Sequence, residues 1–181
     1  MESAQSVLEF WFSESTRPRW FNSTNRFDRE LTERFLDVWK SAAAGELSGW
    51  GETAEGSLAL VIVLDQFPLN MFRGEAESFV TESASRDVAA AAIDRKFDEQ
   101  LNDEQKAFLY LPFMHSESLE DQDRSVALFE SAGLNDNLKW AKHHRDIVRR
   151  FGRFPHRNAV LGRENSPEEA AYLDSNEAFL G

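Results

Sequence analysis

Apolar residues in this chain recur at spacings of three and four. In the first third they form one such series, made of Phe27, Leu31, Phe35, Val38, Trp39 and Ala42. This spacing places the side chains on one face of an α-helix and does not fit a strand, in which alternate residues share a face. Gly45 follows as a stop signal. The pattern predicts a helix over residues 27–42 whose aromatic side chains pack into a core.

Similar signals along the rest of the chain favour an all-α fold. Only five Pro and nine Gly interrupt 181 residues, and 41% of the residues are hydrophobic, including fifteen Phe and five Trp. Such a chain is long enough to bury a sizeable core, so we expect one domain over residues 1–181. Further helices are predicted at about residues 6–12, 53–68, 83–97, 102–111, 118–132, 135–151 and from 166 onward.

Several expectations concern the ends and the faces of these helices. Ser6 has the position of a capping residue, Pro112 is expected to end a helix, and Ser166 followed by Pro167 is a strong start signal. Leu119, Val126 and Phe129 are expected to face inward in one helix. In the next helix, Trp140, His144, Ile147, Val148 and Phe151 form an apolar stripe, whereas His143 points to the opposite face.

The longest apolar run spans residues 58–64. Its pattern alone fits either a buried strand or a buried helix, and its length with the flanking residues favours a central helix. Seven residues are far short of the roughly 20 that a membrane helix needs. No secretory signal is evident at the N-terminus and the chain has no cysteine, which excludes disulfides and thiolate chemistry. We expect a soluble cytoplasmic protein without a membrane partner.

A weak internal repeat is visible in three proline-containing turns. Pro68, Pro112 and Pro155 lie 44 and 43 residues apart (112 minus 68, 155 minus 112), and each is expected to end or follow a helix. That interval would hold two helices and their turns, the unit of an α-solenoid. The spacing predicts stacked helical hairpins in a tetratricopeptide-like α-α superhelix, although the stretches between the prolines do not match.

Charge is distributed unevenly along the chain. The formal net charge is -12, but residues 139–163 hold eight of the twenty Lys and Arg residues, three of the four histidines and one carboxylate. An acidic chain lacks the broad basic surface that duplex binding requires, so no nucleic-acid partner is expected. The basic stretch therefore needs either an anionic ligand or the chain's own acids.

If the hairpins stack in register, the proline turns bring their polar residues together. The first turn offers Asp65, Gln66, Asn70 and Arg73; the second offers His115, Ser116, Glu117 and Gln122; the third offers Arg153, His156, Arg157, Asn158 and Arg163. Guanidinium groups match carboxylate and phosphate oxygens, so the cluster could bind an acidic peptide or a small anion. The structural alternative, which we weigh somewhat higher, pairs Arg153 and Arg157 with Asp65, Glu117 or Asp121.

An enzyme is the second functional hypothesis. His115 or His156 beside Glu117 or Asp65 could act as an acid-base pair, with arginines orienting a phosphorylated or carboxylated substrate. A third is that the cluster is purely structural. No metal spacing, phosphate-binding loop or nucleophile motif is present, so neither metal nor cofactor is expected. The oligomeric state and the identity of a ligand do not follow from the residues.

Three long segments carry a family resemblance: residues 58–74 (LALVIVLDQFPLNMFRG), 108–130 (FLYLPFMHSESLEDQDRSVALFE) and 144–173 (HRDIVRRFGRFPHRNAVLGRENSPEEAAYL). Together with VLEFWF and RWF near the N-terminus, they resemble a bacterial family described as domain of unknown function 924. The resemblance covers nearly the whole chain. It implies an all-helical fold similar to tetratricopeptide repeat proteins, with no established activity, cofactor or catalytic residues. Where the family often has S-T-P-E-E before the last helix, this chain has Asn165-Ser166-Pro167-Glu168-Glu169, which keeps the cap.

Overall fold

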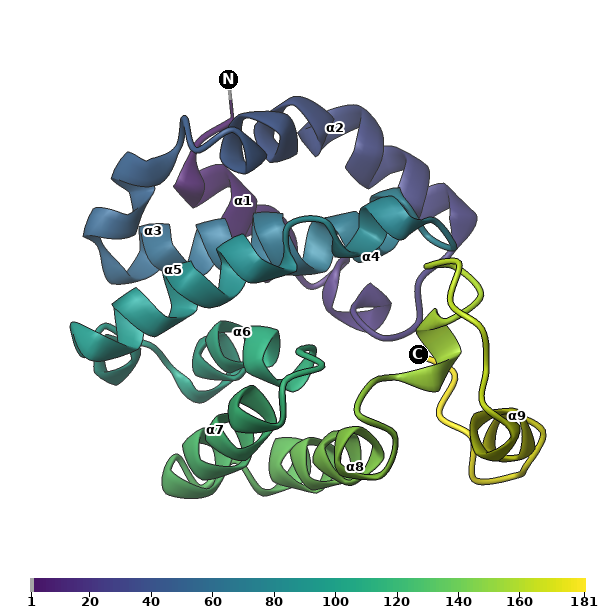
Figure 1. Cartoon of the computed structure of the whole chain (residues 1–181). Coiled ribbons are helices and arrows are strands. Elements are labelled where there is room, and N and C mark those ends of the chain that lie inside the picture. The colour runs from purple at the N-terminus through teal and green to yellow at the C-terminus, as the bar shows by residue number, and fades with distance from the viewer. Residues whose placement is uncertain (1) are drawn as a thin grey trace. The chain divides into compact units, whose positions relative to one another are not determined.

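Helices make up the regular structure of residues 2–181, the part of the chain that the computed structural model describes (Figure 1). They are α1 (Ala4–Trp11), α2 (Asn25–Ala43), α3 (Ala54–Val61), α4 (Phe67–Met71), α5 (Glu82–Asp94), α6 (Asp103–Met114), α7 (Leu119–Ser131), α8 (Asn135–Phe151) and α9 (Pro167–Leu173). No strand occurs in these residues, so the all-α prediction is confirmed. Within the same residues, no helix is long and apolar enough to cross a membrane.

The chain divides into two compact units, each described here by itself. The first unit contains residues 1–73 and 77–112, and the second contains residues 74–76 and 113–181. The boundary at residue 112 falls inside α6. A single domain over the whole chain stays a prediction.

The core of the first unit is built from the apolar faces of α1 to α5. α2 begins at the capping residue Thr24 and buries the predicted residues Phe27, Leu31, Phe35, Val38, Trp39 and Ala42. α1 packs on α3, α3 packs on α5, and α2 packs on α4. Aromatic contacts join these layers, because Trp11 of α1 and Phe35 of α2 both lie against Phe67 of α4, at ring centroid distances of 5.6 and 4.9 Å. The predicted helix over residues 27–42 and its inward face are confirmed.

The apolar run at residues 58–64 is helical and buried, as predicted, but it is not one regular helix. Thr53 caps α3, which passes into a π-helical turn over Ile62–Gln66 (labelled η3) and then into α4. A π-turn holds one more residue than an α-turn, and such turns occur often at functional sites. Here it places Asp65 and Gln66 inside the unit, at 1% and 4% exposure.

Several predicted helix ends are wrong. α1 is capped by Ser3 and not by Ser6, whose side chain instead completes the capping box as the third helical residue. Pro68 lies in the first turn of α4, where its missing N–H has no helical partner to lose, and Pro112 lies within α6, which continues to Met114. Only Pro155 follows a helix after a loop, in the short turn η6 (Pro155–Arg157). The three prolines therefore do not mark equivalent turns, and the proposed repeat loses its support.

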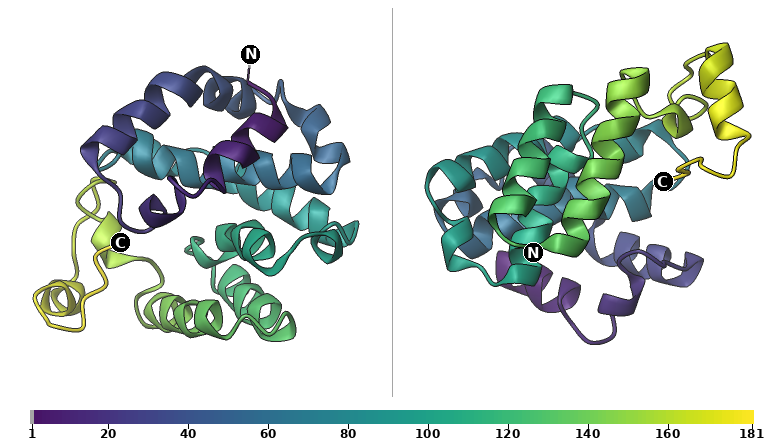
Figure 2. Two further views of the ribbon diagram at one scale, coloured as in Figure 1. Left: turned by 180° about the vertical axis from the view of Figure 1, so that it is seen from behind. Right: turned by 90° about the horizontal axis from the view of Figure 1, so that it is seen from below.

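In the second unit, α7 and α8 lie side by side as a helical hairpin (Figure 2). Ser118 caps α7, and Gly152 ends α8 in the left-handed conformation at φ 74°. The predicted burial is confirmed for His144, Ile147 and Val148 of α8, and His143 is exposed as predicted. The inward placement is wrong for Leu119 and Trp140, which are 41% and 56% exposed. Both lie at the margin of their stripe, where spacing alone does not fix burial.

α9 completes the second unit and has the capping box that its sequence predicts. The Ser166 hydroxyl accepts a hydrogen bond from the Glu169 amide, and the Glu169 carboxylate accepts one from the Ser166 amide. Tyr172 of α9 is buried with Ile147, Val148 and Phe154 in a small apolar cluster. The last residues of the chain, which follow α9, pack Phe179 against the same cluster.

Candidate functional site

The residues predicted to form one site fall into two separate groups in the structure. Asp65, Gln66, Asn70 and Arg73 belong to the first unit. The others belong to the second unit and comprise His115, Ser116, Glu117, Gln122, Arg153, His156, Arg157, Asn158 and Arg163. Each group is joined by hydrogen bonds of its own, and the two are described in turn.

The first group is a hydrogen-bonded row at the π-turn. Gln66 Nε2 donates to Asp65 Oδ2 at 2.6 Å, and Asn70 Nδ2 donates to the Gln66 carbonyl at 3.2 Å. Arg73 donates to Asn70 Oδ1 at 3.0 Å and pairs with Asp28 of α2 at 2.9 Å. The row thus ends in an ion pair between α2 and the residues after α4, which is a structural arrangement.

Glu117 organises the second group. Its carboxylate accepts two hydrogen bonds from the Arg163 guanidinium, at 2.7 and 2.8 Å, and a third from the Phe154 amide at 2.7 Å. Burial alone would raise the pKa of Glu117, but the hydrogen bonds from Arg163 and Phe154 outweigh it and lower the pKa below its usual range. The Arg163 side chain is 24% exposed and that of Glu117 is 25% exposed, so this is a half-buried bidentate pair.

Arg153 is satisfied by a residue that the sequence analysis did not single out as its partner. It donates to both carboxylate oxygens of Glu169, at 2.6 and 2.8 Å, and to the Glu164 carbonyl at 2.8 Å. This pairing lowers the pKa of Glu169 to about 2. The expectation that Arg153 pairs with Asp65, Glu117 or Asp121 names the wrong partner. A cavity of about 220 Å³ lies beside the pair, lined also by Arg150 and Glu168, which pair with each other at 2.8 Å.

Arg157 and Asn158 stabilise the turn at η6 through hydrogen bonds within the second unit. Arg157 is 7% exposed, donates to the His115 carbonyl at 3.0 Å, and lies over the Phe154 ring at 4.9 Å. Asn158 accepts from Arg163 at 2.9 Å and donates to Asn165 at 2.8 Å. Ser116 donates to Asp121, while Gln122 donates to the carbonyls of Met114 and Ser116, both at 2.7 Å. These contacts are internal, as the structural reading expects.

All four histidines gather in the second unit. Burial lowers the pKa of His144 to about 3, although its hydrogen-bonding contact with the Trp140 carbonyl opposes this, and the nearby His115, His143 and His156 lower it further. Burial also lowers the pKa of His156 to about 4, with Arg157, Arg163 and His115 acting in the same direction and Glu117 against it. Both imidazoles are therefore neutral at pH 7. No group of His, Asp or Glu side chains within residues 2–181 is arranged to hold a metal ion.

Phe179 covers three of these histidines. Its ring makes edge contacts with His143, His144 and His156, at centroid distances of 5.8, 4.6 and 5.1 Å. Gly181 lies so close to His156 that a Cβ added there would be 3.2 Å from its ring. We call the surface formed by His143, His144, Phe154 and His156 the histidine face, and residues 175–181 the tail. In Figure 1 the end of the chain lies beside the turn that contains His156.

The arginines and the histidines of the second unit differ in their capacity to bind a ligand. Arg153 and Arg163 are neutralised by carboxylates of the chain, so they have little capacity left for an outside anion. The Nδ1 atom of His156, by contrast, is buried and makes no hydrogen bond within the described residues. Sequence analysis missed the tail because a single Phe near the end of a chain carries no periodic signal. His156 is therefore the one predicted site residue in the histidine face, where a segment of the chain itself already packs.

Two comparisons with known proteins bear on this geometry. The model of the family "Bacterial protein of unknown function (DUF924)" matches residues 7–177. The chain is also similar to a solved structure, a protein of unknown function, ATU0120, from Agrobacterium tumefaciens. The two are 44% identical, the similarity covers 94% of this chain and 96% of that one, and the TM-score is 0.90. No curated protein matches the chain.

Proposed function

We propose, from the premise that the chain belongs to the DUF924 family of bacterial proteins of unknown function, that it is a peptide-binding module. Its site is the histidine face, and its ligand is an acidic segment that carries a phenylalanine. The single observation behind this proposal is the seating of Phe179 on His143, His144 and His156. The tail is the resident occupant, and a partner segment of the same chemistry would compete with it.

The composition of the tail supports a ligand of this kind. The tail and the preceding Asp174 read DSNEAFLG, with two side-chain carboxylates, of Asp174 and Glu177, and one aromatic side chain. A phenylalanine ring presents a positive edge and a negative face, and ring pairs packed edge to face contribute about 0.5–1.5 kcal/mol beyond their buried area. Three imidazole contacts to one ring thus favour an aromatic anchor over an aliphatic one.

The electrostatics of the face support a peptide more than a small inorganic anion. Neutral histidines attract no free anion strongly, while Arg157, Arg163 and Glu117 around His156 are held by internal contacts. The free Nδ1 of His156 offers an acceptor for a peptide N–H or a hydroxyl. A base with a pKa of about 4 is weak at neutral pH, so the acid-base reading of His156 gains no support from this geometry.

Competition between the tail and an added peptide tests the proposal. The probe is a fluorescent peptide, DSNEAFLG, titrated against the wild-type chain and against Phe179→Ala. We expect at least tenfold tighter binding to Phe179→Ala, because the tethered tail acts at an effective concentration of about millimolar and masks the face in the wild type. The measurement is fluorescence anisotropy.

Two controls make this result specific. Leu180 is 72% exposed, so Leu180→Ala alters the tail without removing its anchor and is expected to bind the peptide as the wild type does. The peptide DSNEAALG, which lacks the aromatic ring, is expected not to bind either variant measurably. Equal affinity of the Phe and Ala peptides, or no binding to Phe179→Ala at all, would contradict the proposal.

Two finer expectations stay predictions alongside it. One is the tetratricopeptide-like superhelix of stacked hairpins, for which the α7–α8 hairpin is the relevant element. The other is the cytoplasmic location. Neither enters the argument for the histidine face.

A further inference from the structure

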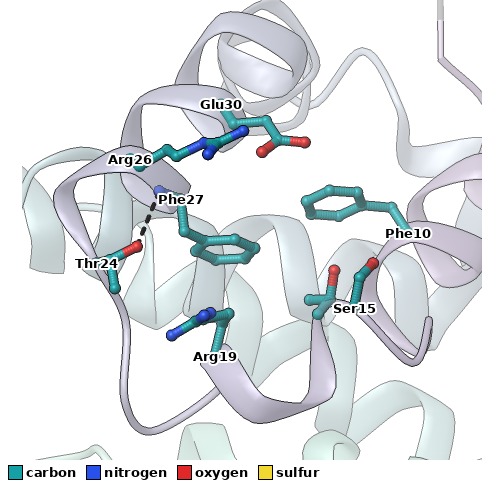
Figure 3. Close-up of a pocket in the computed structure, with 8 residues that line it drawn as sticks. Phe10, Ser15, Arg19, Thr24, Arg26, Phe27 and Glu30 are labelled. Atoms are coloured by element: carbon teal, nitrogen blue, oxygen red, sulfur yellow. Dashed lines mark hydrogen bonds between the residues drawn. The ribbon is translucent and has the colours of Figure 1, made fainter.

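A second cavity, in the first unit, has a lining unlike that of the histidine face. It encloses about 230 Å³ between α1, the short turn η1 (Arg17–Arg19) and the start of α2 (Figure 3). Its lining residues are Phe10, Ser15, Thr16, Arg19, Thr24, Arg26, Phe27 and Glu30. They combine two flat apolar rings, two guanidinium groups, one carboxylate and three hydroxyl groups. Such a combination of apolar walls and a few polar groups is typical of small-molecule sites.

The walls of this cavity are well fixed. Phe27 is 8% exposed and begins the buried stripe of α2, while Thr16 is 2% exposed. The rings of Phe10 and Phe27 are nearly parallel, at 10° and a centroid distance of 5.9 Å. Thr24 accepts a hydrogen bond from the Phe27 amide at 3.3 Å and so fixes the start of α2. An apolar group could rest against these rings without disturbing the core.

The charged groups of the cavity lack partners. The side chains of Arg19, Arg26 and Glu30 make no hydrogen bond, ion pair or ring contact with any other residue in the range 2–181. By contrast, the nearby Arg34 pairs with Glu2 at 2.8 Å and lies over Phe10. Exposed charges are ordinarily solvated, so the informative feature here is that these side chains gather around one cavity beside two apolar rings.

Arg26 and Glu30 are one helical turn apart on α2. In Figure 3 they lie side by side at the top of the cavity, with the rings of Phe10 and Phe27 below them and Arg19 and Ser15 at the opposite side. Residues four apart on a helix are neighbours, but an order with the basic residue first pairs less favourably than the reverse. Their positive and negative groups are therefore available, at adjacent points, to a ligand that carries both charges.

We propose that this cavity binds a small amino acid as a zwitterion. The carboxylate of the ligand pairs with Arg26, its ammonium group pairs with Glu30, and its apolar side chain lies against Phe10 and Phe27. Arg19, at the opposite side of the cavity, gives the lining a net charge of +1. The cavity volume is below the 300–1,000 Å³ typical of drug-sized ligands, which favours a single amino acid.

Calorimetric titration of the full chain with four probes tests this inference. They are L-leucine, 4-methylpentanoate, which lacks the ammonium group, 3-methylbutylamine, which lacks the carboxylate, and inorganic phosphate. We expect L-leucine to bind at least tenfold more tightly than each of the others. The inference would be overturned if 4-methylpentanoate or phosphate bound as tightly as L-leucine. It would also be overturned if L-leucine did not bind at concentrations up to about 10 mM, because only a very weak site would escape detection there.

Charge-removing variants separate the two halves of the site. Arg26→Gln is expected to weaken L-leucine and 4-methylpentanoate alike, whereas Glu30→Gln is expected to weaken L-leucine at least fivefold and leave 4-methylpentanoate unchanged. Both residues are exposed, so the fold is retained, as the melting temperature verifies. Arg29→Gln is the matched control, because Arg29 is exposed on α2 but does not line the cavity. An equal loss of binding in Arg29→Gln would overturn the inference.

Discussion

Replacing Glu117 by glutamine is expected to destabilise the protein by about 2–3 kcal/mol. The change removes the charge that pairs with Arg163 in two hydrogen bonds and weakens the acceptor of the Phe154 amide. Breaking a fully buried pair costs about 3–5 kcal/mol, and the quarter exposure of both side chains reduces that figure. The measurement is the free energy of unfolding in urea, followed by circular dichroism.

Glu168→Gln is the matched control for this substitution. Glu168 also pairs with an arginine at 2.8 Å, but its side chain is 60% exposed and that of Arg150 is 49% exposed. Exposed pairs contribute about 0–1 kcal/mol, so the loss is expected to fall in that range. If both variants lost the same free energy, Glu117 would not hold the turn at Phe154 in the way described.

Acid is expected to destabilise the second unit before its carboxylates titrate. His144 and His156 have pKa values of about 3 and 4 in the folded chain, whereas an unfolded histidine has about 6.5. Between pH 6.5 and 4.5 the unfolded state therefore binds protons that the folded state does not, and stability falls as pH falls. Above pH 6.5 both states are neutral and the two residues add no pH dependence.

The expected loss over this window is about 2–4 kcal/mol, since each histidine contributes at most about 1.4 kcal/mol per pH unit and His156 is partly hydrated. The measurement is the free energy of unfolding at pH 7.0, 6.0, 5.0 and 4.5, with NMR titration of the imidazole carbons to assign the protons. The charged and titratable groups around the pair are His115, His143, Glu117, Arg157 and Arg163. Glu117 and Glu169, whose pKa values are lowered, remain ionised through most of the window.

His156→Phe tests which residue causes the slope. A phenyl ring suits the aromatic contacts with Phe154 and Phe179 and cannot titrate, so the variant is expected to lose roughly half of the pH dependence between pH 6.5 and 4.5. An unchanged slope in His156→Phe would assign the acid sensitivity to other groups.

The helices were predicted correctly from the sequence where the spacing of apolar residues and the capping residues indicated the same bounds. Phe27 to Ala42 and the cap at Ser166 are examples, because each depends on residues within a turn or two of one another. The placement of Pro112 was wrong for a local reason, since a proline removes only its own N–H and crowds the turn before it, so that α6 continues past it to Met114. Trp140 was misplaced because a helical stripe has margins at which burial depends on neighbouring elements.

The candidate site was less accessible to sequence analysis. Its residues could be named, but the pairing of Glu117 with Arg163 spans 46 positions and depends on how the turn after α8 folds back. The partner of Arg153 was missed for the same reason. The cavity at Arg26 gave no signal either, because it combines a helix face, a loop and a helix start that come together only in three dimensions.

The double role of Glu169 bears on how the end of the chain opens. This carboxylate caps α9 by accepting a hydrogen bond from the Ser166 amide at Oε2, and it accepts hydrogen bonds from Arg153 at both Oε1 and Oε2. A helix of seven residues is too short to persist alone in water, so α9 keeps its form only while those contacts and the burial of Tyr172 last. Residues 166–181 should therefore detach as one cooperative segment, and hydrogen exchange of the α9 amides would proceed at the rate at which the tail leaves the histidine face.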